Sequence, residues 1–141
     1  MSKNNRTIGM WLYSNGGGDV IQEKIIKKLN QRDIGVINNL NLRHAIAKNG
    51  HILYDDIKLD KLDLFFSYNA GEQSKYQMYL YQALNRAIPM INSYDSFALT
   101  EDKVHTSFVL RQHGVQTADY KLCHRDDGHQ LKKIIKKWDK M

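Results

Sequence analysis

Short apolar runs alternate along this chain with segments whose apolar residues recur every three or four positions. Continuous apolar runs of about four to eight residues are typical of strands covered on both faces, whereas the longer spacing is typical of helices that bury one side. The pattern predicts strands at residues 7–13, 34–37, 51–54, 62–68, 89–92 and 115–123. It predicts helices that begin at Asp19, span Leu40–Lys48 and Ser74–Ala87, run from Thr100 to Gly114, and cover Leu131–Trp138.

This order of elements predicts an α/β fold. Strands that alternate with helices form a mostly parallel sheet with right-handed crossovers and helices on both faces. We therefore expect a three-layer, Rossmann-like domain over residues 1–123 and a basic helical segment over 124–141.

The stretch from Pro89 to Lys103 organises this interpretation. Pro89 is compatible with the start of a strand, Asn92-Ser93 ends that strand, and a helical pattern follows from Thr100. In an open α/β sheet such a polar turn lies at the carboxyl end of a strand, where ligands bind. Lys103 is expected in the first turn of the helix, where the helix dipole disfavours a cation.

Two further loops follow predicted strands. The glycine run Asn15-Gly16-Gly17-Gly18 precedes a helix, but it lacks the Gly-Lys-Ser/Thr ending of a phosphate loop, and a flexible connection is the simpler role. The second loop, after the aromatic strand 62–68, contains Tyr68, Asn69 and Glu72. Small and polar residues after a buried strand indicate a ligand-facing loop, although an ordinary capping turn has the same composition.

Length and composition are those of one globular unit. The chain has 141 residues, of which 42% are hydrophobic, and no apolar run approaches the roughly 18 residues that span a bilayer. Its beginning does not resemble a secretory signal, so we expect a cytoplasmic protein. Cys123 is the single cysteine, which excludes an intrachain disulfide and a cysteine-based zinc site.

The net charge of +6 suggests an acidic partner. The last ten residues hold five lysines against one aspartate, and a second basic group lies on the polar side of the first helix. Such patches can neutralise nucleic-acid phosphates, but no aromatic residues are interleaved with them, and solvated helix faces explain them more simply. The closing helix could also lie on a membrane surface, but docking on the domain is the simpler interpretation.

Other groups give little indication of chemistry. The pair Asp55-Asp56 could suggest magnesium or acid–base chemistry, but beside nearby lysines it is typical of a solvated turn. Cys123 and His124 are adjacent, so on a strand they would point to opposite faces. The histidines have no metal-binding spacing, and we predict no catalytic residue and no metal site.

Residues 86–123 carry a resemblance to a known family. The Asn92-Ser93 pair, an apolar spacer, the Asp102-Lys103 pair, a helix to Gly114 and the segment after it resemble the end of the N-terminal, pre-ATP-grasp domain of ATP-grasp ligases. The glutathione synthetases and RimK-type glutamate ligases are the class that it resembles most, and the D-alanyl-D-alanine ligases are further off. Residues 1–85 are similar to the family only in their order of elements.

The resemblance implies a function and a set of site residues. These ligases activate a carboxylate as an acyl phosphate, which an amine then attacks. Lys103 would reach toward the nucleotide phosphates, with Asn92, Ser93 and Ser96 in the same crevice. The substrate side would hold the other candidates, Asn15, Gly16, Gly17, Gly18, Tyr68, Asn69 and Glu72.

The resemblance also implies ATP and magnesium in the intact enzyme, with an amino acid or peptide as substrate. In the family these cofactors are held mostly by two later domains, so we expect neither cofactor nor ligase activity for this chain alone. Two alternatives remain. The chain could be a non-catalytic interaction module that forms a homodimer through the tyrosine-bearing helix 74–87, or a basic nucleic-acid-binding domain.

Overall fold

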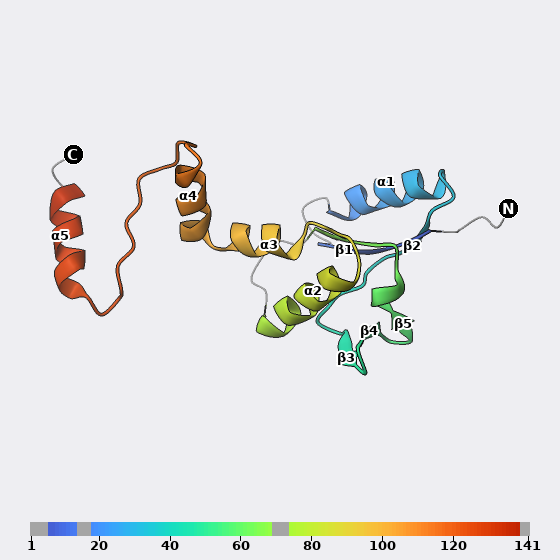
Figure 1. The fold of residues 1–141 in the computed structure, drawn as a ribbon. Coiled ribbons are helices and arrows are strands. Elements are labelled where there is room, and N and C mark those ends of the chain that lie inside the picture. The colour runs from blue at the N-terminus through green and yellow to red at the C-terminus, as the bar shows by residue number, and fades with distance from the viewer. Residues whose placement is uncertain (1–5, 14–17, 69–73, 139–141) are drawn as a thin grey trace. The chain divides into compact units, whose positions relative to one another are not determined.

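The computed structural model describes residues 6–13, 18–68 and 74–138, and it divides into two compact units, residues 1–97 and 98–141. The first unit is an α/β fold built on a four-stranded parallel sheet (Figure 1). The second contains helices joined by an extended segment. The predicted division of the chain at residues 123 and 124 stays a prediction.

The parallel sheet confirms four of the predicted strands. Its order is β2 (Gly35–Ile37), β1 (Thr7–Leu12), β6 (Leu64–Tyr68) and β7 (Met90–Ile91). β1 and β6 are the central strands, paired from Ile8 with Leu64 to Leu12 with Tyr68. Because all four strands run the same way, their carboxyl ends share one edge of the sheet.

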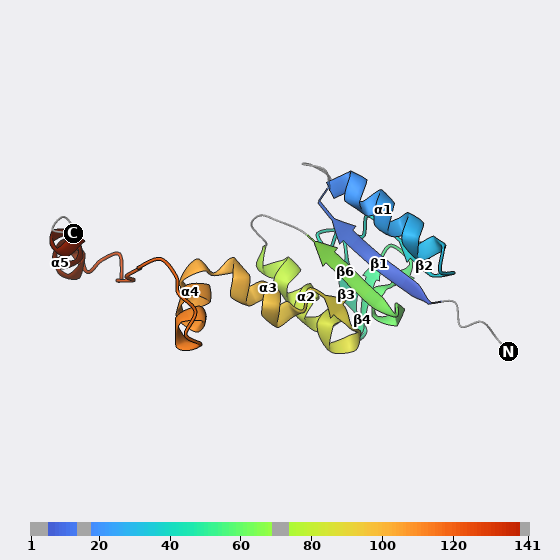
Figure 2. The ribbon, with the colours of Figure 1, turned by 90° about the horizontal axis from the view of Figure 1, so that it is seen from above.

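Helices α1 (Gly18–Asn30) and α2 (Lys75–Ala87) lie on opposite sides of this sheet (Figures 1 and 2). One face of the sheet, with Phe65, packs on the α2 residues Leu80 and Leu84 in a core that is almost completely buried. The other face carries Met10 and Leu12, which are also buried. Side chains that alternate between two covered faces explain why β1 is apolar throughout.

Residues 40–48, predicted as a helix, instead begin a second and antiparallel sheet of β3 (Ile46–Lys48), β4 (His51–Tyr54) and β5 (Ile57–Lys58). Asn49 and Gly50 both have positive φ, 51° and 77°, which is the geometry of a two-residue hairpin turn. The predicted strand 51–54 therefore exists, but it belongs to this hairpin. A short 3₁₀ helix, η1 (Leu59–Lys61), follows.

The second unit contains α4 (Lys103–Gln112) and α5 (Gly128–Trp138). Helix α3 (Tyr94–Glu101), which crosses the boundary of the units, follows β7, so Lys103 begins the next helix and does not lie in the first turn after the strand. The helix predicted to run from Thr100 thus starts later, and Asp102 caps α4 through a bond of 2.8 Å from the His105 N–H to its Oδ1. Gly114 ends the helix with a φ of 74°.

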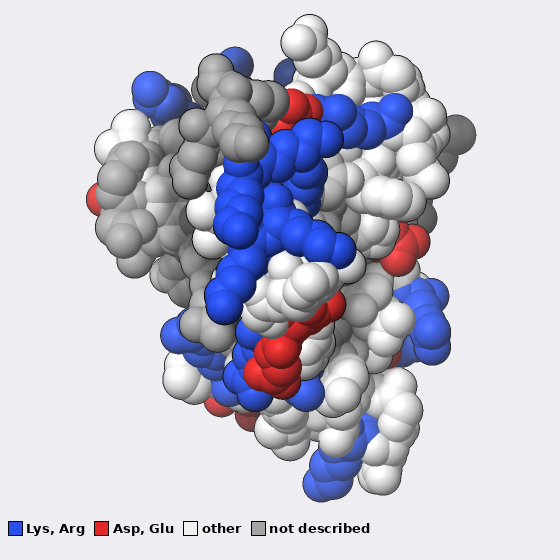
Figure 3. Space-filling model, turned by 90° about the vertical axis from the view of Figure 1, so that its left-hand side faces the viewer, with Lys and Arg blue, Asp and Glu red and all other residues white. Residues whose placement is uncertain are grey.

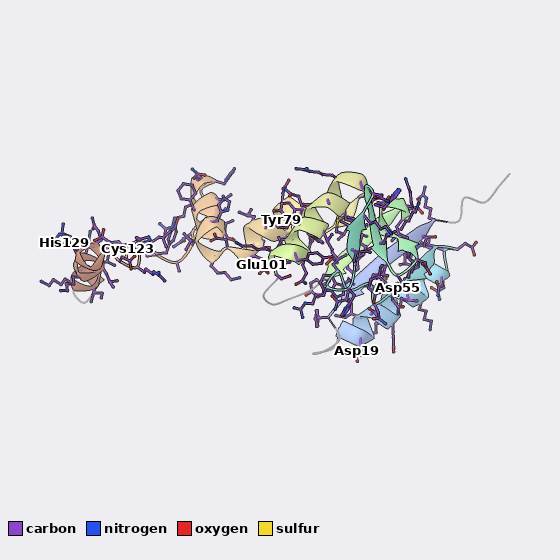
Figure 4. All side chains as sticks on the ribbon, turned by 90° about the horizontal axis from the view of Figure 1, so that it is seen from below. Asp19, Asp55, Tyr79, Glu101, Cys123 and His129 are labelled. Carbon is purple, nitrogen blue, oxygen red and sulfur yellow. The ribbon has the colours of Figure 1, made fainter. Side chains whose placement is uncertain are left out.

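The prediction of a strand at residues 115–123 is wrong. No backbone-to-backbone hydrogen bond joins residues 116–123 to another described residue, and a strand needs a partner for its N–H and C=O groups. The Arg111 side chain holds part of this segment instead, with bonds of 2.9 Å to Thr117 O and 2.6 Å to Asp119 Oδ1. Cys123 lies in the same segment (Figure 4).

None of the helices that the structure describes is both long enough and apolar enough to cross a membrane.

Gly18 tests how closely the first turn of α1 packs against Tyr13, the residue after β1. A Cβ atom there would overlap the Tyr13 carbonyl oxygen and come within 2.8 Å of the Tyr13 ring, whereas a Cβ at Gly128 meets nothing within 4 Å. We predict that Gly18→Ala lowers the free energy of unfolding by about 2 kcal/mol or more, as overpacking does, and that the control Gly128→Ala changes it by less than about 1 kcal/mol. Urea unfolding followed by Trp11 fluorescence, in a Trp138→Phe background, measures both. Equal effects of the two substitutions would contradict this packing.

Asp60 ties η1 to the hairpin. Its Oδ2 lies 2.9 Å from His51 Nδ1, and its Oδ1 accepts a bond of 3.0 Å from the Ile52 N–H. Burial acts to raise the pKa of Asp60, but the hydrogen bonds from His51 and Ile52 outweigh it, so the pKa lies below its ordinary value of 3.8.

A lowered folded-state pKa stabilises the fold above the unfolded value, and this contribution is lost as the pH falls through the folded value. At pH 7 we expect Asp60→Asn to reduce the free energy of unfolding by about 1 to 2 kcal/mol. That difference from wild type should shrink below about pH 4. Urea titrations between pH 7 and pH 2 measure it, with the exposed Asp56→Asn as control. A pH-independent difference would show that the carboxylate charge is not involved.

Candidate functional site

The candidate site is the carboxyl edge of the parallel sheet in the first unit. Strands β1, β6 and β7 are neighbours, and their registers pair Leu12 with Tyr68 and Phe66 with Ile91. Tyr13 and Tyr68 therefore stand side by side at this edge, with Asn92 beginning the turn after β7. In open α/β sheets, ligands bind at this edge.

The structure brings part of the predicted residue set together. Gly18, Tyr68, Asn92, Ser93 and Ser96 all lie at the carboxyl ends of these strands or in the first turn of the helix that follows. Five other predicted positions lie outside the described residues: Asn15, Gly16, Gly17, Asn69 and Glu72. Lys103 belongs to the second unit and is described with it.

Tyr13 and Tyr68 form an aromatic pair at this edge. Their ring centroids are 5.2 Å apart with the planes tilted by 46°, and the Tyr13 N–H donates to Tyr68 O at 3.1 Å. The pKa of the Tyr13 phenol is raised, first by desolvation and then by the neighbouring Tyr68. Tyr68 stays 47% exposed. The pair thus presents a partly exposed aromatic surface beside Gly18, the first residue of α1.

A chain of hydrogen bonds crosses the ends of β6 and β7. The buried Tyr81 of α2 donates its hydroxyl proton to Asn92 O at 2.6 Å, and a hydrogen bond joins its hydroxyl to the Ser67 side chain. Burial raises the pKa of Tyr81, and the bond from Ser67 opposes that rise. Because Ser67 is the penultimate residue of β6 and Asn92 follows β7, Tyr81 fixes the two strand ends relative to each other.

The turn after β7 is held by hydrogen bonds to the start of α3. Ser93 Oγ accepts from the Ser96 N–H at 3.2 Å and donates its hydroxyl proton to Ser96 Oγ at 2.9 Å. Asn85 of α2 accepts the Tyr94 N–H at 2.6 Å. Ser93 therefore serves as a helix cap, whereas the Asn92 side chain is exposed. Of the three predicted residues in this turn, Asn92 and Ser96 are exposed.

Beneath this edge lies a small cavity of about 10 Å³. Its walls combine apolar side chains with the polar groups of Ser67, Gln77 and Tyr81. That volume holds about one water molecule, so the cavity is a feature of core packing and too small for a substrate.

Gln77 was not predicted from the sequence. It is 2% exposed, and its Oε1 accepts bonds from the Ser74 N–H at 3.0 Å, from Ser74 Oγ at 2.9 Å and from Arg43 Nε at 3.3 Å. The spacing Ser74-x-x-Gln77 is a capping box, which could have identified the first two bonds. No sequence pattern indicates the bond to Arg43, because it joins residues 34 positions apart.

Lys103 is the first residue of α4 and is exposed. No ion pair or hydrogen bond joins its amine to another residue within the described ranges, so pairing with Glu101 or Asp102 does not explain its position. Within the same ranges, no three His, Cys, Asp or Glu side chains gather in a way that could hold a metal ion.

Comparison of the chain with protein-family models, with curated proteins and with solved structures gives no match. The resemblance to ATP-grasp ligases therefore stays a prediction.

The Tyr81 hydroxyl can be tested by removing it. Tyr81→Phe deletes the link between Ser67 and Asn92 O, so we predict a loss of about 1 to 2 kcal/mol in the free energy of unfolding. The matched control is Tyr79→Phe on the same helix, because Tyr79 is 68% exposed (Figure 4) and should change stability by less than about 0.5 kcal/mol. Urea unfolding measures both, and equal losses would refute the role of the link.

Proposed function

We propose that this chain is the substrate-side domain of an ATP-dependent carboxylate–amine ligase of the glutathione synthetase and RimK class. The observation that supports it most is the carboxyl edge of the sheet, where Tyr68 ends β6, Asn92 follows β7 and Gly18 begins the helix after β1. Parallel strands place their ligands at this edge. The exposed aromatic and amide groups there suit a small polar substrate.

The finer fold is part of this proposal. The first unit has a parallel sheet with α1 and α2 on opposite sides, which agrees with a Rossmann-like, pre-ATP-grasp domain. The small antiparallel sheet β3-β4-β5 is an addition to the predicted pattern. It lies between β2 and β6 in sequence and leaves the order of the parallel strands intact.

Features of the second unit also support the proposal. Residues 116–123 are extended without a strand partner, and in α5 the exposed Leu131 and Ile135 lie on the side opposite the lysines. In a further α/β layer, such a segment would be a strand that pairs with neighbouring strands. Such a helix would bury its apolar side on the sheet that they form. The ligase proposal assigns such a layer, and most of the nucleotide site, to other domains.

In this proposal the two units have different roles. The carboxyl edge of the first unit receives the acceptor substrate, and Lys103 faces the nucleotide phosphates. An exposed lysine without an ion-pair partner among the described residues is suited to a phosphate oxygen. Magnesium would assist phosphoryl transfer, but no residues in the described ranges are suited to hold it, so we assign it no site in this chain.

A second candidate is a protein-interaction module. It is favoured by the exposed side chains of α2 and α5: Tyr76 and Tyr79 are 47% and 68% exposed, and Leu131 and Ile135 are 45% and 47% exposed. Helix α5 has four lysines and no acidic residue, and basic side chains stand out in the view of Figure 3. This candidate needs no nucleotide, which separates it from the ligase.

The affinity for ATP tests the ligase proposal in the protein as its gene encodes it. We expect Lys103→Ala to weaken ATP binding about tenfold or more, equivalent to about 1.4 kcal/mol. The control Lys132→Ala, on the solvated side of α5, should leave the affinity within about twofold. Titration calorimetry at fixed ionic strength measures all three proteins.

Two results would count against the proposal. An unchanged affinity in Lys103→Ala, or equal losses in both variants, would remove the role of Lys103. Absence of ATP binding by the wild-type protein would overturn the ligase proposal altogether and favour the interaction module.

A further inference from the structure

Arg43 is a cation that the fold holds in place near the candidate site. It lies in a turn between the buried residues Leu42 and Ala45, which are 0% and 1% exposed. Within the turn, Asn41 Oδ1 accepts the Arg43 N–H at 2.9 Å, and Tyr76 of α2 donates its hydroxyl to Ala45 O at 2.5 Å. The turn is thereby attached to the first helical turns of α2, and Arg43 remains exposed.

The side chain of Arg43 is held as well as its backbone. Its Nε donates to Gln77 Oε1 at 3.3 Å, and the same oxygen accepts two bonds from Ser74, the cap of α2. Gln77 is almost completely buried, so it is a fixed anchor. The two terminal guanidinium nitrogens of Arg43 bond to none of the residues that the structure describes.

The surroundings of Arg43 favour an anion. No carboxylate within the described ranges pairs with it, and the first turn of α2 contains no acidic residue but does contain Lys75. The amino end of α2 adds the positive end of its dipole. Because α2 is the helix that follows β6, this end lies on the side of the sheet to which the Tyr68 end of β6 points.

We propose that Arg43 binds a carboxylate group of the acceptor substrate and that Gln77 is its positioning residue. The assignment of the ligand to the acceptor rests on the proposed ligase function. With Nε bound to Gln77, the two terminal nitrogens form a planar fork that matches both oxygens of a carboxylate. A lysine cannot supply that geometry, because its ammonium group is a single point charge.

The binding can be measured on the 141-residue chain with glutarate as the probe. In ¹⁵N NMR titrations, we expect glutarate to shift the Arg43 Nε–Hε signal and the Gln77 side-chain amide signals. Its neutral isostere glutaramide should shift neither. Arg43→Met should weaken glutarate binding about tenfold or more, as loss of a charge-assisted pair does, and Arg43→Lys should restore only part of the affinity. The matched control Lys75→Met, one positive charge removed on the same side of the fold, should weaken binding by less than about threefold.

Several outcomes would overturn the proposal. They are equal losses of glutarate affinity in Arg43→Met and Lys75→Met, equal shifts by glutaramide, full glutarate affinity of Arg43→Lys, and binding of inorganic phosphate as tight as that of glutarate. Thermal unfolding of each variant shows whether it is folded, because Arg43 is exposed and its loss should leave the melting temperature nearly unchanged. Failure of the ligase proposal gives a different result: glutarate binding would still depend on Arg43, but the gene product would not bind ATP.

Discussion

The shape of the carboxyl edge depends on the hydrogen bonds of the Tyr81 hydroxyl group. This group lies in the buried core and is bonded to Ser67 on one side and Asn92 O on the other. A buried hydroxyl without partners would cost the fold more than its bonds return, so β6, α2 and the turn after β7 must keep their mutual positions. The ring of Tyr81 also contacts Phe97, with centroids 5.4 Å apart.

Gln77, one helical turn earlier in α2, is a second buried polar side chain whose hydrogen bonds hold neighbouring segments in place. Both residues lie on the buried side of α2, where a helix normally presents only apolar side chains, and both direct their polar atoms to the carboxyl side of the sheet. The remaining core, around Phe65, Leu59 and Leu84, is apolar. Departures from the apolar pattern are thus concentrated near the carboxyl edge of the sheet, and functional sites are where proteins commonly depart from simple folding rules.

The sequence predicted the parallel strands because continuous apolar runs identify strands buried on both faces. It failed at residues 40–48, where Leu42, Ala45 and Ile46 fit a helical period as well as they fit a buried turn and a strand. The Asn49-Gly50 pair in that region is a hairpin signal, but a glycine at this position is equally typical of a helix end. The strand prediction at residues 115–123 also failed, because strand propensity cannot supply a missing hydrogen-bonding partner.

Part of the candidate site followed from topology alone. Residues after parallel strands share one edge, so Gly18, Tyr68 and Asn92 could be predicted without coordinates. Arg43 could not, because its position depends on one bond to a buried glutamine far along the chain. Tyr81 lies in the helix predicted at residues 74–87, but no local pattern shows that its hydroxyl faces a strand end.

The central claim is that this edge receives a carboxylate that is then activated by ATP. Trapping with hydroxylamine tests it most directly, because an acyl phosphate reacts with hydroxylamine to give a stable hydroxamate. The protein as its gene encodes it should form a hydroxamate only when ATP and a suitable amino acid, peptide or dicarboxylate are both present. If a panel of such acids gives no ATP-dependent hydroxamate while the protein is folded and binds ATP, the account of this edge as the acceptor side of a ligase is contradicted.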